Sequence, residues 1–258
     1  MTIDIDPLAF GVSLLPWTAL LTIVGACGAI LWMLRRAATF GLTPRTTYGI
    51  ALRAALWSTL GGRLFHVIDH ADFYSDVPFQ AFYLWNGGLS LWGSLIVGAG
   101  GALWHAKRAG ATLSAFAHAL MLAGLAALTV GRLGDFLAGE RVGTGSSLAW
   151  AVTYANERSV AFSAGSAHPV ALYEALLAIV LLVVLVRLWH RIKRARAIDI
   201  AFAGYAVGRF LIGFVTVERT VGGLDFSQWV ALAVLGVISL FAVRGYARSR
   251  ILDSPART

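Results

Sequence analysis

The chain has 258 residues with a mean hydropathy of +0.74, and 58% of its residues are hydrophobic while only 13% are charged. Soluble domains carry about twice that share of charge, so a soluble enzyme, a disordered chain, a coiled coil and a disulfide scaffold are excluded. The single cysteine, Cys27, leaves no internal disulfide and no cysteine-based metal cluster. We therefore expect a polytopic, all-α membrane protein with no metal and no cofactor.

Seven apolar stretches are long enough, or nearly so, to cross a bilayer, which takes about 20 residues. In chain order they run approximately over residues 16–34, 48–68, 84–105, 113–137, 169–189, 198–217 and 227–243. The first stretch follows a segment with two aspartates and no Lys or Arg, unlike the basic start of a secretory signal. We expect that stretch to remain as a membrane helix, which gives seven transmembrane helices.

The connections between these stretches alternate in charge. One side carries 14 of the 21 Lys and Arg residues, whereas the opposite loops carry three, Arg141, Arg158 and Arg219. Because Lys and Arg are enriched in cytoplasmic loops, this bias predicts an N-terminus outside and a C-terminus in the cytoplasm. The net charge of +8 then reflects membrane topology, and no nucleic-acid partner is expected.

The connections are mostly short, so we expect residues 1–258 to form a single integral-membrane domain. The exception is residues 138–167, a polar stretch rich in Gly and Ser that the topology places outside, in the periplasm. Loops of this length are usually functional or mobile.

Ionisable side chains within membrane spans are costly, and by default they indicate functional sites. The predicted topology places six of them in the outer half of the bundle: Arg63, Arg132, Asp135, His168, Glu174 and Arg209. Two carboxylates leave one of the three arginines unneutralised, and a guanidinium group fits a phosphate with two hydrogen bonds. A lipid phosphate is the simplest partner, and the alternative is a buried ion-pair network that only holds helices together.

The segment NGGLSLWGS (86–94) contains three glycines, an asparagine and two serines, which is too polar for a lipid-facing helix. We interpret it as facing the interior of the bundle beside a polar cavity.

Four motifs follow one another along the third to sixth stretches: WNGGLSLWGSLIVG, GRLGDFLAGE, HPVALYE and GYAVGRFLIGF. Together they resemble the prolipoprotein diacylglyceryl transferase family over most of the chain. The resemblance implies a multi-pass protein of the bacterial inner membrane. It also implies an activity, in which the diacylglyceryl group of phosphatidylglycerol moves to the lipobox cysteine thiol of a prolipoprotein and glycerol phosphate leaves.

The resemblance, taken with the buried charges, assigns two sets of residues. The expected catalytic set is Arg132, Arg209, Asp135, Glu140, His168 and Glu174, with Arg132 holding the lipid phosphate. The expected lipid-binding set is Arg63, Asn86, Gly87, Gly88, Trp92, Gly131, Tyr173 and Tyr205.

Four positions depart from the family pattern. Trp92 stands where the family has a histidine that is a candidate base, and Asp135 stands where it has an asparagine. Thr18 and Gly213 replace a tyrosine and a glutamate that are common in the family. Tryptophan cannot accept a proton from a thiol, so the candidate bases are His168, Asp135 and His66.

Two functions are compatible with these observations. The first is a divergent transferase that keeps the phosphate-binding arginines. The alternative is a catalytically altered, lipid-binding paralogue that acts as a subunit of a membrane complex. A transporter or channel is disfavoured, because the charges cluster at one depth instead of lining a path through both leaflets.

Overall fold

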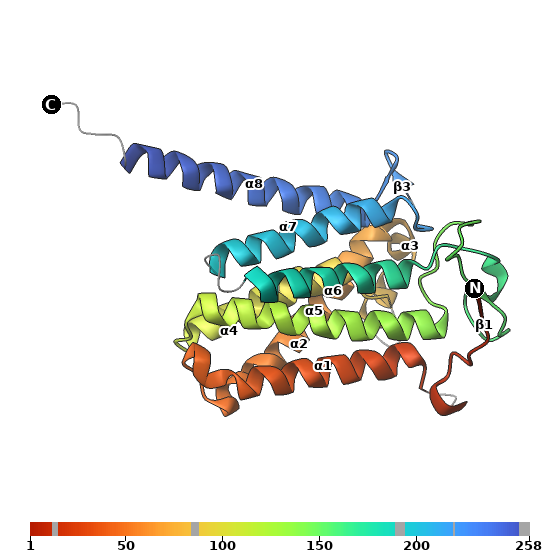
Figure 1. Ribbon diagram of the computed structural model, residues 1–258, viewed down its shortest axis with the longest axis horizontal. Coiled ribbons are helices and arrows are strands. Elements are labelled where there is room, and N and C mark those ends of the chain that lie inside the picture. The colour runs from red at the N-terminus through yellow and green to blue at the C-terminus, as the bar shows by residue number, and fades with distance from the viewer. Residues whose placement is uncertain (12–14, 84–87, 189–193, 219, 253–258) are drawn as a thin grey trace.

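The computed structural model describes residues 1–11, 15–83, 88–188, 194–218 and 220–252. It is mostly helical, with long helices lying side by side in a bundle (Figure 1). The α-helices are α1 (Trp17–Arg35), α2 (Pro44–Asp69), α3 (Ala71–Asp76), α4 (Leu91–Arg108), α5 (Leu113–Ala138), α6 (Val170–Leu188), α7 (Arg194–Gly213) and α8 (Phe226–Leu252). The strands are β1 (Thr2–Ile3), β2 (Thr153–Tyr154), β3 (Thr220–Val221) and β4 (Leu224–Asp225), and the 3-10 helices include η2 (Ala37–Phe40), η3 (Pro78–Phe82) and η5 (Phe162–Ala164).

Long helices lie at all seven stretches that the sequence predicts to be apolar spans. Three of them, Trp17–Arg35, Leu113–Ala138 and Val170–Arg187, are long and apolar enough to cross a membrane. Among the described residues, Phe226–Leu240 is a shorter apolar helix. The remaining helices carry charged or glycine-rich segments that lower their hydropathy, as Arg53 and Arg63 do in α2.

The third predicted stretch starts later than the sequence indicates, because α4 begins at Leu91 and not near residue 84. Gly88 has a φ of +78°, a conformation that favours glycine, and the Ser90 N–H donates to the Gly62 carbonyl at 2.9 Å. Residues 88–90, which lead into α4, are therefore held against α2. Asn86 and Gly87, which the sequence assigns to the lipid-binding set, lie outside the described residues.

Small residues let neighbouring helices approach closely. Between α1 and α5, a Cβ at Gly134 would come within 2.7 Å of the Trp17 carbonyl oxygen. Between α2 and α4, a Cβ at Gly61 would lie 2.5 Å from the Gly93 carbonyl oxygen. The glycines thus set the spacing of these two helix pairs, as the sequence suggested for glycine in a membrane protein.

The long polar stretch 138–167 is folded against the N-terminal segment. Strand β1 pairs in parallel with β2, and the Met1 amino group donates to the Ala151 carbonyl at 2.7 Å. The Tyr154 hydroxyl donates to the Phe136 carbonyl at 2.6 Å. Burial raises the pKa of Tyr154 to about 12, so this hydroxyl stays protonated as a donor. The N-terminus and the 138–167 stretch therefore lie at the same end of the bundle.

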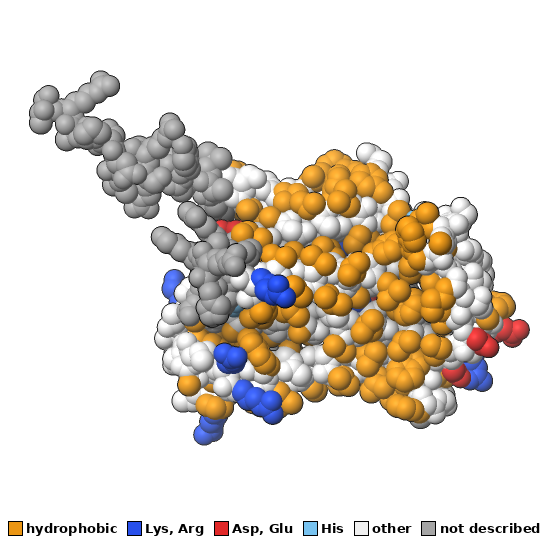
Figure 2. Space-filling view, in the orientation of Figure 1, with side chains coloured by type: hydrophobic (Ala, Val, Ile, Leu, Met, Phe, Trp, Pro, Cys, Tyr) orange, Lys and Arg blue, Asp and Glu red, His pale blue; other side chains and the backbone are white. Residues whose placement is uncertain are grey.

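Hydrophobic side chains cover the middle of the surface drawn in Figure 2. On this face, most Lys and Arg side chains lie toward one end of the bundle, and Asp and Glu side chains gather at the other (Figure 2). Exposed apolar residues on several helices, including Leu31, Leu56 and Val186, contribute to the apolar surface. Water solvates such a surface poorly, whereas lipid tails solvate it well.

Candidate active site

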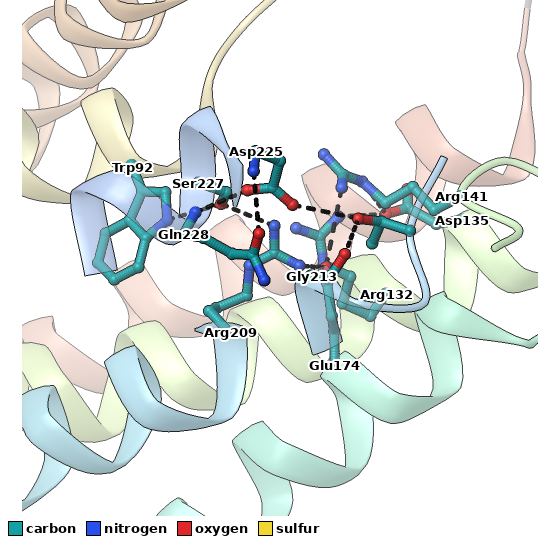
Figure 3. Close-up of polar contacts among 11 residues, drawn as sticks. Trp92, Arg132, Asp135, Arg141, Glu174, Arg209, Gly213, Asp225, Ser227 and Gln228 are labelled. Carbon is teal, nitrogen blue, oxygen red and sulfur yellow. Dashed lines mark hydrogen bonds and ion pairs between the residues drawn. The ribbon is translucent and has the colours of Figure 1, made fainter. Parts of the chain in front are cut away.

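A fully buried carboxylate forms the centre of a charged cluster inside the bundle. Glu174, in the first turn and a half of α6, has none of its surface exposed. One of its oxygens forms an ion pair with Arg132 of α5, and the other forms an ion pair with Arg209 of α7 (Figure 3). Three helices therefore meet at one side chain.

Two further charged residues complete this cluster. Asp135 lies one turn after Arg132 on α5 and forms an ion pair with it. Arg141 follows the end of α5, and its guanidinium lies 3.6 Å from an Asp135 oxygen and 3.8 Å from a Glu174 oxygen. Three guanidinium groups thus share two carboxylates within the ion-paired cluster, which leaves one positive charge available for an anion.

Arg209 connects the cluster to the indole of Trp92. The Arg209 guanidinium donates to the Ser227 hydroxyl oxygen at 2.8 Å, and the Trp92 indole N–H donates to the same oxygen at 2.7 Å. All three side chains are buried. The one polar atom of Trp92, the residue expected to stand where the family has a histidine, is therefore satisfied.

The start of α8 fixes Ser227 in place. Asp225 and Gln228 form a reciprocal cap, because an Asp225 carboxylate oxygen accepts from the Gln228 N–H at 2.6 Å and the Gln228 side-chain oxygen accepts from the Asp225 N–H at 2.9 Å. A Cβ at Gly213 would lie 2.5 Å from the Gln228 side chain. Gln228 therefore occupies the space into which a glutamate at position 213 would extend.

A polar cavity of about 350 Å³ opens beside this network. Its lining includes His66, Trp92, Arg141, Arg209, Glu218 and Ser227. The Glu218 residue is exposed overall, but partial burial of its carboxyl group, and then the negative charge of Asp225, raises its pKa. Two of the three clustered arginines line this cavity, and Arg132 does not, so an anion in the cavity would meet Arg141 and Arg209.

A second cavity, of about 220 Å³, is almost entirely apolar. Residues of α2, α4, α5 and α7 line it, among them Ser58, Leu95, Leu125 and Tyr205. The Tyr205 ring packs edge-on against Trp92, with 5.4 Å between ring centroids. Since Trp92 lines the polar cavity and Tyr205 lines the apolar one, this aromatic pair lies at the boundary between them.

Several residues predicted from the sequence lie outside the charged cluster. The Arg63 guanidinium donates to the carbonyls of Gln80, Ala81 and Gly88, and so holds the connection before α4. The His168 ring nitrogen Nδ1 lies 3.1 Å from the Tyr173 hydroxyl, which also accepts from the Trp150 indole at 2.9 Å.

Two more predicted residues also lie apart from the cluster. Glu140 has no ion pair within the part of the chain that the structure describes, although its N–H donates to the Asp135 carbonyl. A Cβ at Gly131 would meet Thr22 of α1, so this glycine packs α5 against α1.

Three residues that complete the site, Arg141, Ser227 and Gln228, were not predicted from the sequence. Arg141 was counted only as a charge of an outer loop, and nothing in its neighbourhood indicates that the chain turns back toward Glu174. Ser227 and Gln228 were placed in an apolar span. The sequence Asp225–Phe226–Ser227–Gln228 does carry a detectable signal, because an acidic residue followed three positions later by Gln is typical of a capped helix start.

The fold and the site together define a helical membrane protein with a buried arginine–carboxylate cluster beside a polar cavity. A family model described as prolipoprotein diacylglyceryl transferase matches residues 7–244. The chain belongs to this family, as its motifs predicted.

Known relatives carry the corresponding name. A phosphatidylglycerol–prolipoprotein diacylglyceryl transferase 1 of Streptomyces coelicolor is 32% identical over 228 residues, covering 86% of this chain and 66% of the relative. The transferase of Streptomyces griseus is also 32% identical, covering 86% of this chain and 70% of the relative. The transferase of Rhodococcus jostii is 35% identical over 213 residues, covering 75% of this chain and 59% of the relative. The chain thus spans between 59% and 70% of the length of these three relatives.

Proposed function

We propose that this protein transfers the diacylglyceryl group of phosphatidylglycerol to the lipobox cysteine thiol of a prolipoprotein. The observation that carries the proposal is the position of Arg141 and Arg209, which both line the polar cavity and belong to a cluster with one excess positive charge. A phosphate group bound in the cavity would neutralise that charge. Family membership and the names of the relatives support the same reaction.

The arginines have different roles in this proposal. Arg141 makes only long contacts with carboxylates, at 3.6 and 3.8 Å, so its guanidinium is the most available for a phosphate. Arg209 is the second phosphate ligand. Arg132 is held by Glu174 and Asp135 and does not line the cavity, so we assign it to positioning Glu174 and thereby Arg209.

The proposed transfer reaction uses the positive charge of Arg141 and Arg209 at the polar cavity. The thiol sulfur attacks the glyceryl C3 carbon, the bond between that carbon and the phosphate oxygen breaks, and glycerol phosphate leaves with the electron pair. Arg141 and Arg209 stabilise the negative charge that develops on the leaving phosphate. Preorganised groups of this kind contribute about 10²–10³-fold each to kcat.

The apolar cavity supplies a place for part of a lipid chain. Its lining between α2, α4, α5 and α7 is almost entirely apolar, and the Trp92–Tyr205 pair lies at its boundary with the polar cavity. Phosphatidylglycerol has a charged headgroup next to acyl chains. The adjacent polar and apolar cavities match that division.

The proposed arrangement in the membrane has seven spans, α1, α2 and α4–α8, forming one integral domain over residues 1–258 of a bacterial inner-membrane protein. The N-terminus and residues 138–167 face outward, and the C-terminus faces the cytoplasm. The separation of Lys and Arg from Asp and Glu on the surface in Figure 2 supports this orientation. The charged cluster then lies in the outer half of the membrane, where the proposed substrates meet.

The test is a transfer assay with the purified full-length protein, phosphatidylglycerol vesicles and a lipobox peptide, in which release of glycerol phosphate is measured. We expect release by the natural protein and a loss of about 10²-fold or more with Arg141→Gln or Arg209→Gln. Arg158→Gln is the matched control, because Arg158 is exposed and pairs with Asp6 at 3.1 Å, away from the cluster. No release by the natural protein above the Arg209→Gln background would contradict the proposal.

A second candidate function is a lipid-binding subunit of a membrane complex that has lost the chemistry. The buried, hydrogen-bonded Trp92 favours it, because an indole at this position cannot act as a base. The same assay separates the two functions. A protein that binds phosphatidylglycerol through Arg141 and Arg209 but releases no glycerol phosphate would be the binding subunit.

A further inference from the structure

The polar cavity contains an imidazole with no assigned role. His66 lies in the last turn of α2, half-buried, and lines the cavity together with Arg141 and Arg209. Among the residues that the structure describes, neither ring nitrogen of His66 has a hydrogen-bond partner. An imidazole with an uncommitted nitrogen beside a phosphate-binding cavity has the chemistry of a general base.

The two other candidate bases from the sequence, Asp135 and His168, already interact with other side chains. Asp135 is 5% exposed, forms an ion pair with Arg132 and lies 3.6 Å from Arg141, so protonating it would break the charged cluster. His168 contacts the Tyr173 hydroxyl at 3.1 Å and is not among the residues lining the cavity. Neither is placed to take a proton from a substrate beside Arg209.

The surroundings of His66 fix its ring. The His66 and His70 rings lie at 35° to each other with centroids 4.3 Å apart, and Tyr74 packs edge-on against His66 at 6.0 Å. Gly88, with its φ of +78°, lies so close that a Cβ there would overlap the His66 ring and approach Arg63. The segment before α4 is therefore shaped to leave room for this imidazole at the cavity.

We propose that His66 is the general base of the transfer reaction, doing the work that Trp92 cannot. This inference rests on the proposed function. A ring nitrogen of His66 accepts the thiol proton as the sulfur attacks the glyceryl carbon. Glycerol phosphate leaves with the electron pair of the broken carbon–oxygen bond, and the imidazolium then releases its proton to the leaving phosphate or to water.

Several charged or titratable groups surround this imidazole and would influence its titration. They are Arg63, Asp69, His70 and Tyr74 near the outer end of α2, Arg141 after α5, Arg209 on α7, and Glu218 in the connection to α8. Glu218 is the strongest competitor, since its carboxyl group lines the same cavity. The experiment therefore includes it.

The experiment measures kcat/KM of the purified full-length protein against pH, with phosphatidylglycerol vesicles and a lipobox peptide. For the natural protein we expect a rate that falls on the acid side as the base becomes protonated. His66→Gln should lower kcat about 10²-fold or more and remove this acid limb, while phosphatidylglycerol binding in native mass spectrometry stays unchanged. Free imidazole should partly restore the activity of His66→Ala.

Two variants serve as comparisons. His105→Gln changes a histidine near the other end of α4 from the cavity, where its Nε2 accepts from Trp57 at 3.4 Å, and should keep natural activity and the natural pH profile. Glu218→Gln should keep the acid limb.

Retention of activity and of the acid limb in His66→Gln would overturn the assignment, and so would loss of the limb in Glu218→Gln. No glycerol phosphate release by the natural protein would instead overturn the proposed function, and this inference with it.

Discussion

Glu174 and Arg209 form an ion pair in which the carboxylate is fully buried and the guanidinium is 4% exposed. Because Glu174 also pairs with Arg132, one carboxylate holds α5, α6 and α7 together. Arg209 of this pair also lines the polar cavity, whereas Glu174 does not. The pair's contribution to stability and its proposed contribution to anion binding can be separated by mutation.

Glu174→Gln removes the negative charge between two buried guanidinium groups. Breaking a buried pair by neutralising one partner costs about 3–5 kcal/mol, so we expect a loss of that size in the free energy of unfolding, measured by denaturant titration in detergent. Glu157→Gln is the matched control, because Glu157 is exposed in the 138–167 stretch. Equal stability of the two variants would contradict the buried network.

Ser227→Ala removes the oxygen that accepts from both Trp92 and Arg209. A buried indole N–H without an acceptor costs about 1–3 kcal/mol, and the unfolding midpoint should fall accordingly. The double variant Trp92→Phe/Ser227→Ala should be less destabilised than the sum of the two single variants, since the orphaned indole donor is absent. Additive effects would show that the two side chains do not interact. Ser163→Ala, at an exposed position of the 138–167 stretch, serves as the neutral control.

Gly88→Ala tests the packing beside His66. Gly88 and Gly110 have almost the same φ, +78° and +80°, but a Cβ at Gly110 would meet no atom within 4 Å whereas a Cβ at Gly88 would overlap the His66 ring. Alanine at either position incurs the left-handed backbone cost of about 1–2 kcal/mol. Gly88→Ala should be the more destabilising of the two and should also reduce transfer, whereas Gly110→Ala should reduce stability alone. Identical stability and activity in both variants would contradict the position of His66.

The proposed topology predicts a cytoplasmic C-terminus. A fluorescent reporter fused after residue 258 should be active, and an alkaline phosphatase fused there should be inactive. The expected result follows from the 14 Lys and Arg residues on one side against three on the other. The reverse pattern of reporter activity would contradict the orientation.

The sequence was sufficient to locate the helices and to predict four of the five clustered charges, Arg132, Asp135, Glu174 and Arg209, but not Arg141. Hydropathy found all seven long helices, and the cost of burying Arg132, Glu174 and Arg209 indicated that they would meet. Hydropathy did not predict where α4 begins. The helix starts at Leu91, after Gly88 with its left-handed backbone, and an apolar pattern does not encode such a turn.

The roles of the individual arginines were also beyond the sequence. Arg132 was expected to hold the phosphate, yet only the folded chain shows that two carboxylates engage it and that Arg141 returns from the loop to the cavity. The sequence likewise could not distinguish among His66, Asp135 and His168 as the base, because the distinction depends on which side chains each of them contacts in the fold. Periodicity and local motifs carry no information about contacts between distant helices.

The most direct test of the account is an experimental structure of the full-length protein in phosphatidylglycerol nanodiscs. We expect lipid phosphate density in the polar cavity between Arg141 and Arg209, with an acyl chain extending toward the apolar cavity beside Tyr205. Another basic cavity, lined by Arg45, Arg53 and Arg108 at the opposite ends of α2 and α4, provides an internal comparison. Phosphate density in that basic cavity, with none between Arg141 and Arg209, would contradict the proposal that these two arginines bind the lipid phosphate.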